Sequence, residues 1–337
     1  MLIKRIGAFF IAVWSIFMSF FGIEVPLGEK AENFRVTSYV VAEYVQSENA
    51  FCPEDFDIIT DAILFGCARF DENGNVTTDE KILTTALNNL RKAIGDRDVN
   101  ITLNLLGPQQ YGDSSVYEEQ MAYQAALHTK AFESGVLEQN IRDVILEYGF
   151  DGVHFDYEYP ISKKAWSAFN KFLVSLKKEM PDRLLGVAVS DWDLRLNTKA
   201  MNAVDTIELM LYDNYDAEGR HAPYDVCTSY ARNTALKGLP LEKVNFGLPF
   251  YARPTDRGAY WYSYNAYYDK LDSNAYYHDS TINKDFWFNT KDVVGEKTEF
   301  AINNGFGGVM IWHYSCDLPS TNENSLLTAV SDAIKTK

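Results

Sequence analysis

The chain has 337 residues, of which 47% are hydrophobic and 23% charged, a composition typical of a globular protein with a sizeable core. Its formal net charge of −16 disfavours binding to nucleic acid and to anionic lipid surfaces. The length fits one large α/β barrel or two smaller domains, and the sequence shows neither a low-complexity tract nor a short repeat.

The first 24 residues have the layout of an export signal. Lys4 and Arg5 precede an apolar run from Ile6 to Ile23, which Glu24 ends. The run is longer than the about 7–15 residues usual in a signal peptide and reaches the lower end of the about 17–25 that span a bilayer. A cleaved signal peptide and a membrane anchor through residues 6–23 therefore both remain open. In either case the basic residues stay inside, which predicts a protein that is secreted or held on the outer face of the cell membrane.

After this segment, short β-branched or aromatic stretches alternate with helical patterns. Eight strands are predicted: Arg35–Val41, Ala62–Ala68, Asn100–Leu105, Gly152–Tyr157, Leu184–Ser190, Thr206–Tyr212, Val244–Pro249 and Gly308–Trp312. A capping box from Thr77 to Glu80 opens one expected helix, apolar residues recur at helical spacing from Trp166 to Leu176, and Ser325–Lys337 closes the chain as a helix. This alternation predicts an α/β fold, a (β/α)8 TIM barrel over residues 31–337.

Four cysteines stand at positions 52, 67, 227 and 316, and none has the spacing of a metal ligand. We therefore expect no metal site, and no motif points to a cofactor. Cys52 and Cys67 are the closest couple along the chain. A disulfide in an exported protein and buried free thiols are both compatible with this pattern.

The fourth predicted strand runs into the stretch FDGVHFDYEYP. Because successive side chains of a strand point to opposite faces, His154, Asp156 and Glu158 fall on one face. Burying such groups without partners costs several kcal/mol, so stability alone gives no reason to assemble them. The stretch therefore indicates a functional site, and the alternative is a purely structural ion-pair network inside the barrel.

Other polar and aromatic residues follow the sixth, seventh and eighth strands, at the edge where the active sites of barrel enzymes lie. Between the seventh and eighth strands, residues 254–285 form an insertion rich in tyrosine and tryptophan. The insertion is predicted to form a wall of the cleft, where aromatic rings stack on sugars. The same rings also fit a small aromatic core of the insertion itself.

The stretch DGVHFDYE resembles the D-G-x-D-x-D-x-E signature of family 18 glycoside hydrolases, and YEYP resembles the W-E-Y-P of its chitinase branch. The motifs MLYD, FGLPFYAR and GFGGVMIW resemble those of the sixth, seventh and eighth strands of that family. The likeness spans about Arg35 to Asp317, in family order. The chain departs from the family at His154, where the middle aspartate stands, at Tyr157 in place of tryptophan, and at Asn104 and Leu106 in place of S-x-G on the third strand.

The resemblance implies a retaining hydrolase of β-1,4-linked N-acetylglucosamine polymers, in which the substrate's own 2-acetamido oxygen attacks the anomeric carbon. Glu158 is then the acid and later the base, with an ionised Asp156 helping to keep it protonated. Asp156 also holds the acetamido N–H, and Tyr212 its carbonyl oxygen. The expected substrate-binding residues are Asp213, Trp312, Tyr251, Arg253 and Tyr39, and His154 is expected to change how Asp156 titrates.

Three functions stay open at this point. The first is an exported chitinase, and the second an endo-β-N-acetylglucosaminidase that acts on N-glycans or peptidoglycan. The third is a chitin-binding lectin without turnover, which is disfavoured because lectin-like members of the family lose the glutamate that this chain keeps as Glu158. In each case the partner is a polysaccharide or oligosaccharide that contains N-acetylglucosamine.

Overall fold

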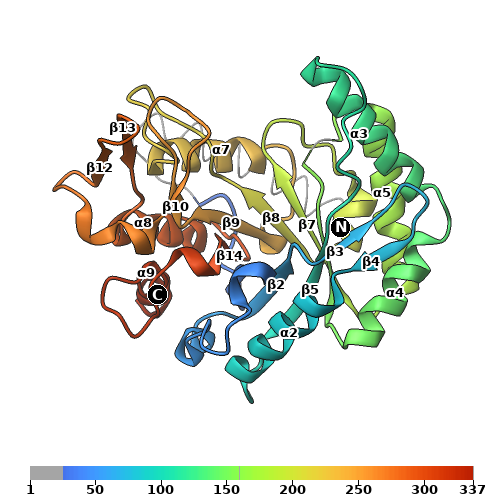
Figure 1. Ribbon diagram of the computed structural model, residues 1–337, viewed down its shortest axis with the longest axis horizontal. Coiled ribbons are helices and arrows are strands. Elements are labelled where there is room, and N and C mark those ends of the chain that lie inside the picture. Colours follow the sequence, from blue (N-terminus) through green and yellow to red (C-terminus); the bar gives the residue numbers. More distant parts are fainter. Residues whose placement is uncertain (1–25, 159, 337) are drawn as a thin grey trace.

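The computed structural model describes residues 26–158 and 160–336, so the predicted export signal lies outside the described residues. Eight parallel strands close into a barrel in the order β1-β14-β9-β8-β7-β6-β5-β2 (Figure 1). They are β1 (Arg35–Val41), β2 (Asp61–Phe65), β5 (Asn100–Leu105), β6 (Gly152–Asp156), β7 (Leu184–Ser190), β8 (Thr206–Met210), β9 (Val244–Pro249) and β14 (Gly308–Trp312). The predicted barrel and each of its predicted strands are confirmed.

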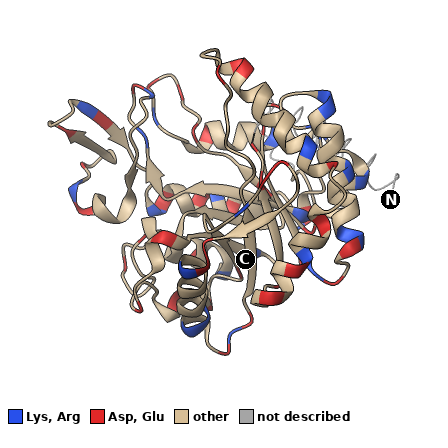
Figure 2. Cartoon of the chain, turned by 45° about the vertical axis from the view of Figure 1, so that its right-hand side comes forward, with Lys and Arg blue, Asp and Glu red and all other residues tan. Residues whose placement is uncertain are grey.

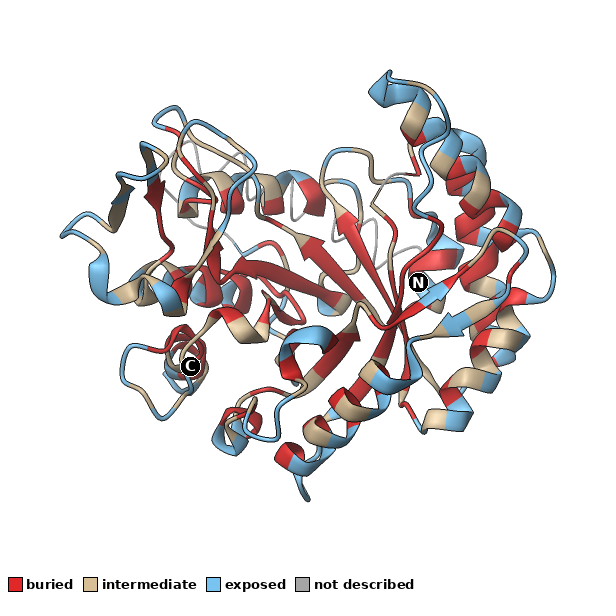
Figure 3. Ribbon diagram, in the orientation of Figure 1, coloured by how far each residue is buried: buried red, intermediate tan, exposed pale blue. Residues whose placement is uncertain are grey.

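Helices cover the outside of the barrel, and their buried sides face the strands (Figure 3). They are α2 (Glu80–Ile94), α3 (Tyr117–Phe132), α4 (Leu137–Tyr148), α5 (Lys163–Glu179), α6 (Thr198–Ala203), α7 (Tyr224–Ala235), α8 (Lys291–Asn303) and α9 (Leu326–Lys335). The periodicity from Trp166 to Leu176 is the buried face of α5, which begins where the Ser162 side chain accepts a hydrogen bond from the Ala165 N–H. Short 3-10 turns lie at η1 (Ala42–Val45), η2 (Pro53–Asp57), η3 (Leu241–Lys243), η4 (Tyr264–Ala266), η5 (Tyr268–Lys270) and η6 (Tyr314–Cys316).

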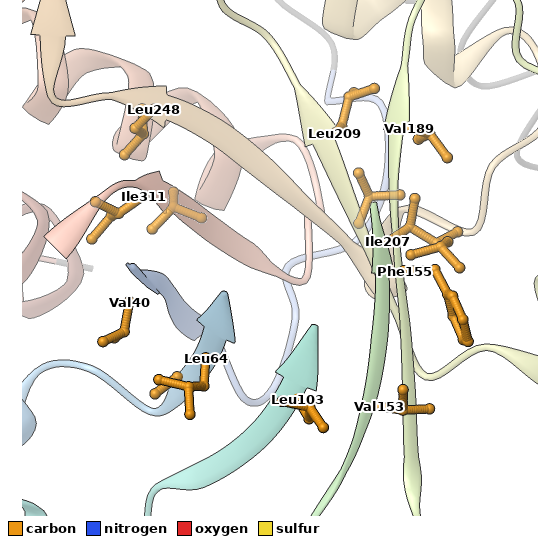
Figure 4. Packing of buried hydrophobic residues seen from close by; sticks show 14 of the residues in the cluster. Val40, Leu64, Leu103, Val153, Phe155, Val189, Ile207, Leu209, Leu248 and Ile311 are labelled. Atoms are coloured by element: carbon orange, nitrogen blue, oxygen red, sulfur yellow. The ribbon is translucent and has the colours of Figure 1, made fainter. Parts of the chain in front are cut away.

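The strands separate an aliphatic outer face from a mixed inner face. Leu103, Val153 and Ile207 belong to the hydrophobic cluster between strands and helices and are fully buried (Figure 4). Burial of one such side chain stabilises the fold by about 1.5–3 kcal/mol. Polar residues such as Thr37 and Asn245 instead alternate onto the inner face, where the Asn245 amide donates to the Thr37 hydroxyl over 3.0 Å.

The capping box predicted at Thr77 is wrong. Thr77 lies in β4 (Val76–Thr78), which pairs antiparallel with β3 (Ala68–Phe70), so its backbone is extended and belongs to a hairpin. Asp79 caps α2 instead, and its carboxylate accepts a hydrogen bond from the Ile82 N–H. The same hairpin explains why the second barrel strand ends earlier than predicted: Gly66 turns the chain at a φ of 90°, between β2 and β3.

Residues 251–287, which include the insertion, form two small antiparallel sheets, which pair β10 (Tyr251–Ala252) with β11 (Tyr262–Ser263), and β12 (Tyr276–Asp279) with β13 (Lys284–Trp287). Figure 1 shows the insertion on the side of the barrel away from α3. The ring of Tyr262 stacks on Tyr267 at 4.5 Å and on Phe286 at 4.3 Å. Most of the aromatic rings therefore form a core for the insertion, whereas Tyr260 and Trp261 stay exposed to 48% and 41%.

All four cysteines are free thiols, so Cys52 and Cys67 do not form a disulfide. Charged residues of both signs lie mainly on the helices and loops that surround the barrel (Figure 2). Within residues 26–158 and 160–336, no helix has the length and apolar character needed to cross a membrane.

Candidate active site

Asp156 ends β6 and Glu158 follows two residues later, at the carboxyl edge of the barrel. On the opposite face of the strand, Phe155 packs edge-on against Phe169 and Phe172 of α5, at ring distances of 6.2 and 5.4 Å. The predicted division of β6 into an apolar outer face and an ionisable inner face is therefore present. His154 lies one step deeper inside the barrel and is only 1% exposed.

A hollow of about 330 Å³ opens beside the two carboxylates, and we call it the Trp312 pocket. It contains most of the predicted substrate-binding residues, which come from the ends of β8, β9, β10 and β14. Its lining comprises Val41, Tyr44, Phe65, Asp156, Glu158, Met210, Tyr212, Asp213, Tyr251, Arg253, Trp261, Trp312 and His313. The fold thus brings together residues that lie more than 150 positions apart in the sequence.

Trp312 is held from below by two aromatic rings. Tyr39 meets it edge-on at 5.0 Å and Phe65 at 5.2 Å. Tyr39 is only 1% exposed and does not line the pocket, so contact between Tyr39 and a ligand would require its neighbours to move. Its role in the described structure is to support Trp312.

Asp213 is the centre of a hydrogen-bond network at the edge of the Trp312 pocket. Arg253 donates through Nε to Oδ1 and through Nη2 to Oδ2, at 2.5 and 2.8 Å, and the Tyr251 hydroxyl donates to Oδ1 at 2.6 Å. His221 Nε2 lies 3.0 Å from the same oxygen. Burial tends to raise the pKa of Asp213, but the contact with His221 and the hydrogen bonds from Arg253 outweigh it and hold the pKa well below its ordinary value. The Asp213 carboxylate is therefore ionised, and both of its oxygens already accept hydrogen bonds from protein donors.

Tyr212 keeps its proton at neutral pH. Burial, followed by the negative charges of Asp156 and Glu158, raises the pKa of its phenol well above 10.0. A phenol that stays protonated is a hydrogen-bond donor for a carbonyl oxygen in the pocket.

Asp156 differs from the prediction of an ionised carboxylate. Burial, and then the neighbouring charge of Glu158, raises the pKa of Asp156 well above 3.8. Repulsion between the two carboxylates follows from their spacing along the strand, but the desolvation of Asp156 does not, because it depends on the closed barrel. The pair therefore retains a proton at a higher pH than two solvated carboxyl groups would.

A second hollow of about 380 Å³ lies on the other side of the two carboxylates, beneath α3, and we call it the α3 pocket. It shares Phe65, Asp156 and Glu158 with the Trp312 pocket, so these three residues stand between the two hollows. Its remaining lining is formed by Leu106, Gly107, Gln109, Tyr111, Tyr117, Gln120, Met121, Gln124, His128 and Tyr157. The two carboxylates thus border both hollows.

Tyr157, which departs from the family motif, packs flat on His128 of α3, with ring centroids 4.4 Å apart and an angle of 4°. Gly107 permits this arrangement, because a Cβ at that position would lie 1.9 Å from His128 Nε2. Burial lowers the pKa of His128 to about 4, so the imidazole is neutral at neutral pH.

Several residues of the site were not predicted from the sequence. Tyr44, which lines the Trp312 pocket, and His221, which contacts Asp213, are two of them. Trp261 and His313 also line this pocket, and they belong to the insertion and to the end of the eighth strand, which the sequence placed at this edge. His221 follows Asp213 by only eight positions, but no sequence pattern around either residue predicts their contact. Within the described ranges, no group of three or more His, Cys, Asp or Glu side chains is placed to hold a metal ion.

Comparisons with known proteins find relatives that are described as chitinases. Endochitinase 1 of Metarhizium anisopliae is 22% identical over 250 residues, which cover 58% of this chain and 58% of that protein. The chain spans less than two thirds of the length of the curated relatives that it matches.

Two solved structures share the fold over nearly the whole chain. The chitinase ChiB from the chitin utilization locus of Flavobacterium johnsoniae has a TM-score of 0.66 at 23% identity, over 91% of this chain and 94% of that one. The chitinase-like agglutinin of Robinia pseudoacacia has a TM-score of 0.66 at 17% identity, over 88% and 98%. Residues 35–317 match the family model "Glycosyl hydrolases family 18". Since this match covers most of the chain, the chain belongs to family 18 of the glycosyl hydrolases.

Proposed function

We propose that this protein hydrolyses β-1,4-linked N-acetylglucosamine polymers, chitin or chitooligosaccharides, with retention of configuration. The observation that carries the proposal is the position of Asp156 and Glu158 between the Trp312 pocket and the α3 pocket. An oligosaccharide that fills both pockets has a glycosidic bond beside Glu158, and binding energy from both sides orients that bond.

In the proposed reaction the reacting sugar occupies the Trp312 pocket, with one ring face on Trp312. Glu158 donates a proton to the leaving oxygen while the acetamido oxygen of the substrate attacks the anomeric carbon. Tyr212 donates to that acetamido group and Asp156 accepts its N–H, which stabilises the positive charge of the cyclic intermediate. Glu158 then removes a proton from water, which opens the intermediate and restores the β configuration.

The charges of the site favour a neutral glycan over peptidoglycan. Among the described residues that line the α3 pocket there is no lysine or arginine, and His128 is neutral there. Arg253 is already bonded to Asp213. A substrate that carries carboxylates would therefore meet Asp156 and Glu158, while the one arginine that lines the Trp312 pocket among the described residues is neutralised by Asp213. The similarity to proteins described as chitinases supports the same choice.

A chitin-binding lectin is the second candidate, and the similarity to a chitinase-like agglutinin supports it. The two carboxylates argue for turnover, because binding alone does not require a buried acid beside a scissile bond.

The deciding experiment uses chitooligosaccharides of four to six sugars as substrates for the purified full-length protein. Their hydrolysis is followed by NMR, which identifies the product anomer in the first minutes. We expect initial β product from the wild type and none from Glu158→Gln. Glu147→Gln, at an exposed position on α4, is the matched control and should leave the rate unchanged. Binding of chitooligosaccharides without turnover would favour the lectin, and cleavage of N-glycans or peptidoglycan alone would favour the endo-β-N-acetylglucosaminidase.

We also propose that the protein is exported, either secreted or held on the outer face of the membrane. The support is the basic pair Lys4 and Arg5 followed by the apolar run to Ile23. Cell fractionation with an antibody against the barrel tests this, and a cytoplasmic protein with an intact N-terminus would contradict it.

A further inference from the structure

Helix α8 carries a lysine whose side chain has no exposed surface. Lys297 is 0% exposed, and its ammonium group donates hydrogen bonds to the Ala222 carbonyl at 2.6 Å and to the side-chain oxygen of Asn289. The thiol of Cys227 on α7 is the third neighbour, and this thiol donates its own proton to the Leu211 carbonyl at 3.0 Å. Three acceptors therefore surround Nζ, which matches the three donors of a protonated lysine.

Stability alone does not explain a lysine at this position. A buried ammonium group loses its hydration, and none of the three partners of Lys297 is a carboxylate that would compensate the charge. Burial accordingly lowers the pKa of Lys297 from its ordinary value of 10.5. Methionine is similar in length and would fill the same space without this desolvation. The reason for the lysine is therefore sought in the segment that its partners hold.

That segment is residues 211–222, between β8 and α7, and we call it the Asp213 turn. Asp213 stands near its start and His221 near its end, where the imidazole lies 3.0 Å from Asp213 Oδ1. Ala222 has a φ of 49°, and its N–H donates to the Asn214 carbonyl across the turn at 2.7 Å. A residue other than glycine keeps such a left-handed backbone only where its surroundings enforce it. The turn therefore needs external support.

Lys297 supports both ends of the Asp213 turn. Its hydrogen bond to the Ala222 carbonyl holds the left-handed residue directly. Asn289 extends the contact to His221, because its side-chain amide donates to the His221 carbonyl at 3.1 Å. The thiol partner binds the other end of the turn, at the Leu211 carbonyl. Each of the three partners of the ammonium group thus belongs to the turn or is bonded to it.

We propose that Lys297 is a positioning residue, whose buried ammonium group ties both ends of the Asp213 turn to α8 and thereby keeps His221 against Asp213. The consequence for a ligand rests on the proposed function. Asp213 lines the Trp312 pocket, where the network around its carboxylate shapes the site for the sugar. Without Lys297 the turn moves, Asp213 loses its contact with His221, and an oligosaccharide in this pocket is bound less tightly.

The first test measures hydrogen exchange of backbone amides by mass spectrometry in the wild type and in Lys297→Met. The Asp213 N–H donates to His221 Nε2 at 3.1 Å, and the Ala222 N–H is bonded across the turn. We expect residues 211–222 to exchange about tenfold faster in Lys297→Met, while β2 and β5 on the far side of the barrel are unchanged. Unchanged exchange in the turn, or faster exchange along the whole chain, would overturn the proposal. This readout needs no activity, so it is separate from a failure of the proposed function.

Lys243 provides a matched control, because its ammonium group also donates to backbone carbonyls. Lys243 directly precedes β9, at the amino end of the barrel strands and thus at the edge opposite the active site. Its acceptors are the carbonyls of Met201, Asn202 and Val204. Lys243→Met should lower the melting temperature without faster exchange in residues 211–222. If Lys243→Met opened the Asp213 turn as much as Lys297→Met, the effect would be general destabilisation and the proposal would fail.

The second test asks whether Lys297 acts through His221. We expect Lys297→Met to raise KM for chitotetraose about fivefold, the factor that one ordinary hydrogen bond provides, and His221→Phe to raise it by a similar factor. In the double variant KM should exceed that of His221→Phe by less than about twofold, because the residue that Lys297 positions is already lost. Independent effects that multiply in the double variant would overturn the proposal.

A second variant keeps the proposal testable if Lys297→Met does not fold. Asn289→Ala retains the lysine and removes only its link to the His221 carbonyl. We expect faster exchange in residues 211–222 and a KM about threefold higher for chitotetraose, in the same direction as Lys297→Met. Wild-type exchange in the turn of Asn289→Ala would contradict the proposed path from Lys297 to His221.

Discussion

Replacement of Gly186 by alanine is predicted to crowd His154. The added Cβ would lie 2.6 Å from His154 Cδ2 and 2.8 Å from Thr206 Oγ1, whereas carbon atoms in contact are about 3.5–4.0 Å apart. The ring cannot simply move away, because Asn104 and Tyr39 hold it from two other sides. The ring or β7 must therefore shift by about 1 Å in a close-packed interior. Overpacking of this kind costs about 1–3 kcal/mol, and we expect that loss of stability for Gly186→Ala.

A double-mutant cycle identifies the clash. His154→Ala removes the ring, which supplies two of the three nearest atoms to the new Cβ. The loss of stability in the double variant should therefore be smaller than the sum of the two single losses by about 1 kcal/mol or more. Urea unfolding of the four proteins, followed by circular dichroism, measures this difference. Gly295→Ala on α8 is the control, because a Cβ there meets nothing within 4 Å, and alanine in a helix is neutral or slightly stabilising. Strictly additive losses in the cycle would refute the reasoning.

Three further predictions follow from the site. Arg253→Met removes two of the hydrogen bonds to the partly exposed Asp213. The loss of binding free energy should be about 1–2 kcal/mol, which raises KM for chitotetraose about 5- to 30-fold. An unchanged KM would show that Arg253 does not order the pocket. Trp261→Ala removes an exposed ring from the edge of the Trp312 pocket. KM should rise about threefold to tenfold for chitohexaose and less for chitobiose derivatives, and steady-state assays with both substrates measure the difference. His128 has a pKa of about 4 in the fold against about 6.5 when solvated, so the unfolded chain takes up a proton first and stability is lost as pH falls from about 6.5 toward 4. Between pH 7 and 4.5 the wild type should lose about 2–3 kcal/mol more than His128→Phe in urea unfolding, and equal losses would contradict this sign.

The barrel could be predicted from the sequence because each strand carries its own local signal. Segments such as Leu184–Ser190 and Val244–Pro249 are apolar, short and bounded by turns, and their observed bounds match the predicted ones. The prediction failed where a local motif competed with pairing at longer range. Thr77 had the spacing of a helix cap, but its pairing with Arg69 in a hairpin decided its conformation.

For the site, the sequence by itself determined the ionisable face of β6 and the group of residues at the strand ends, because alternation along a strand and the position of barrel strand ends are local properties. It did not determine which aromatic residues of the insertion are exposed. Tyr262 and Tyr267 stack into a core and Trp261 does not, and this depends on how two small sheets meet.

Only the tertiary structure decided the electrostatics and the partners of the site. Desolvation of Asp156 and the support of Trp312 by Tyr39 need strands that are distant in sequence to stand side by side, and the contact of His221 with Asp213 needs the segment after β8 to turn back on itself. The same is true of the space that Gly186 leaves for His154. The physical reason is that burial and hydrogen bonding depend on all the atoms around a group, whereas a sequence pattern reports only on its neighbours along the chain.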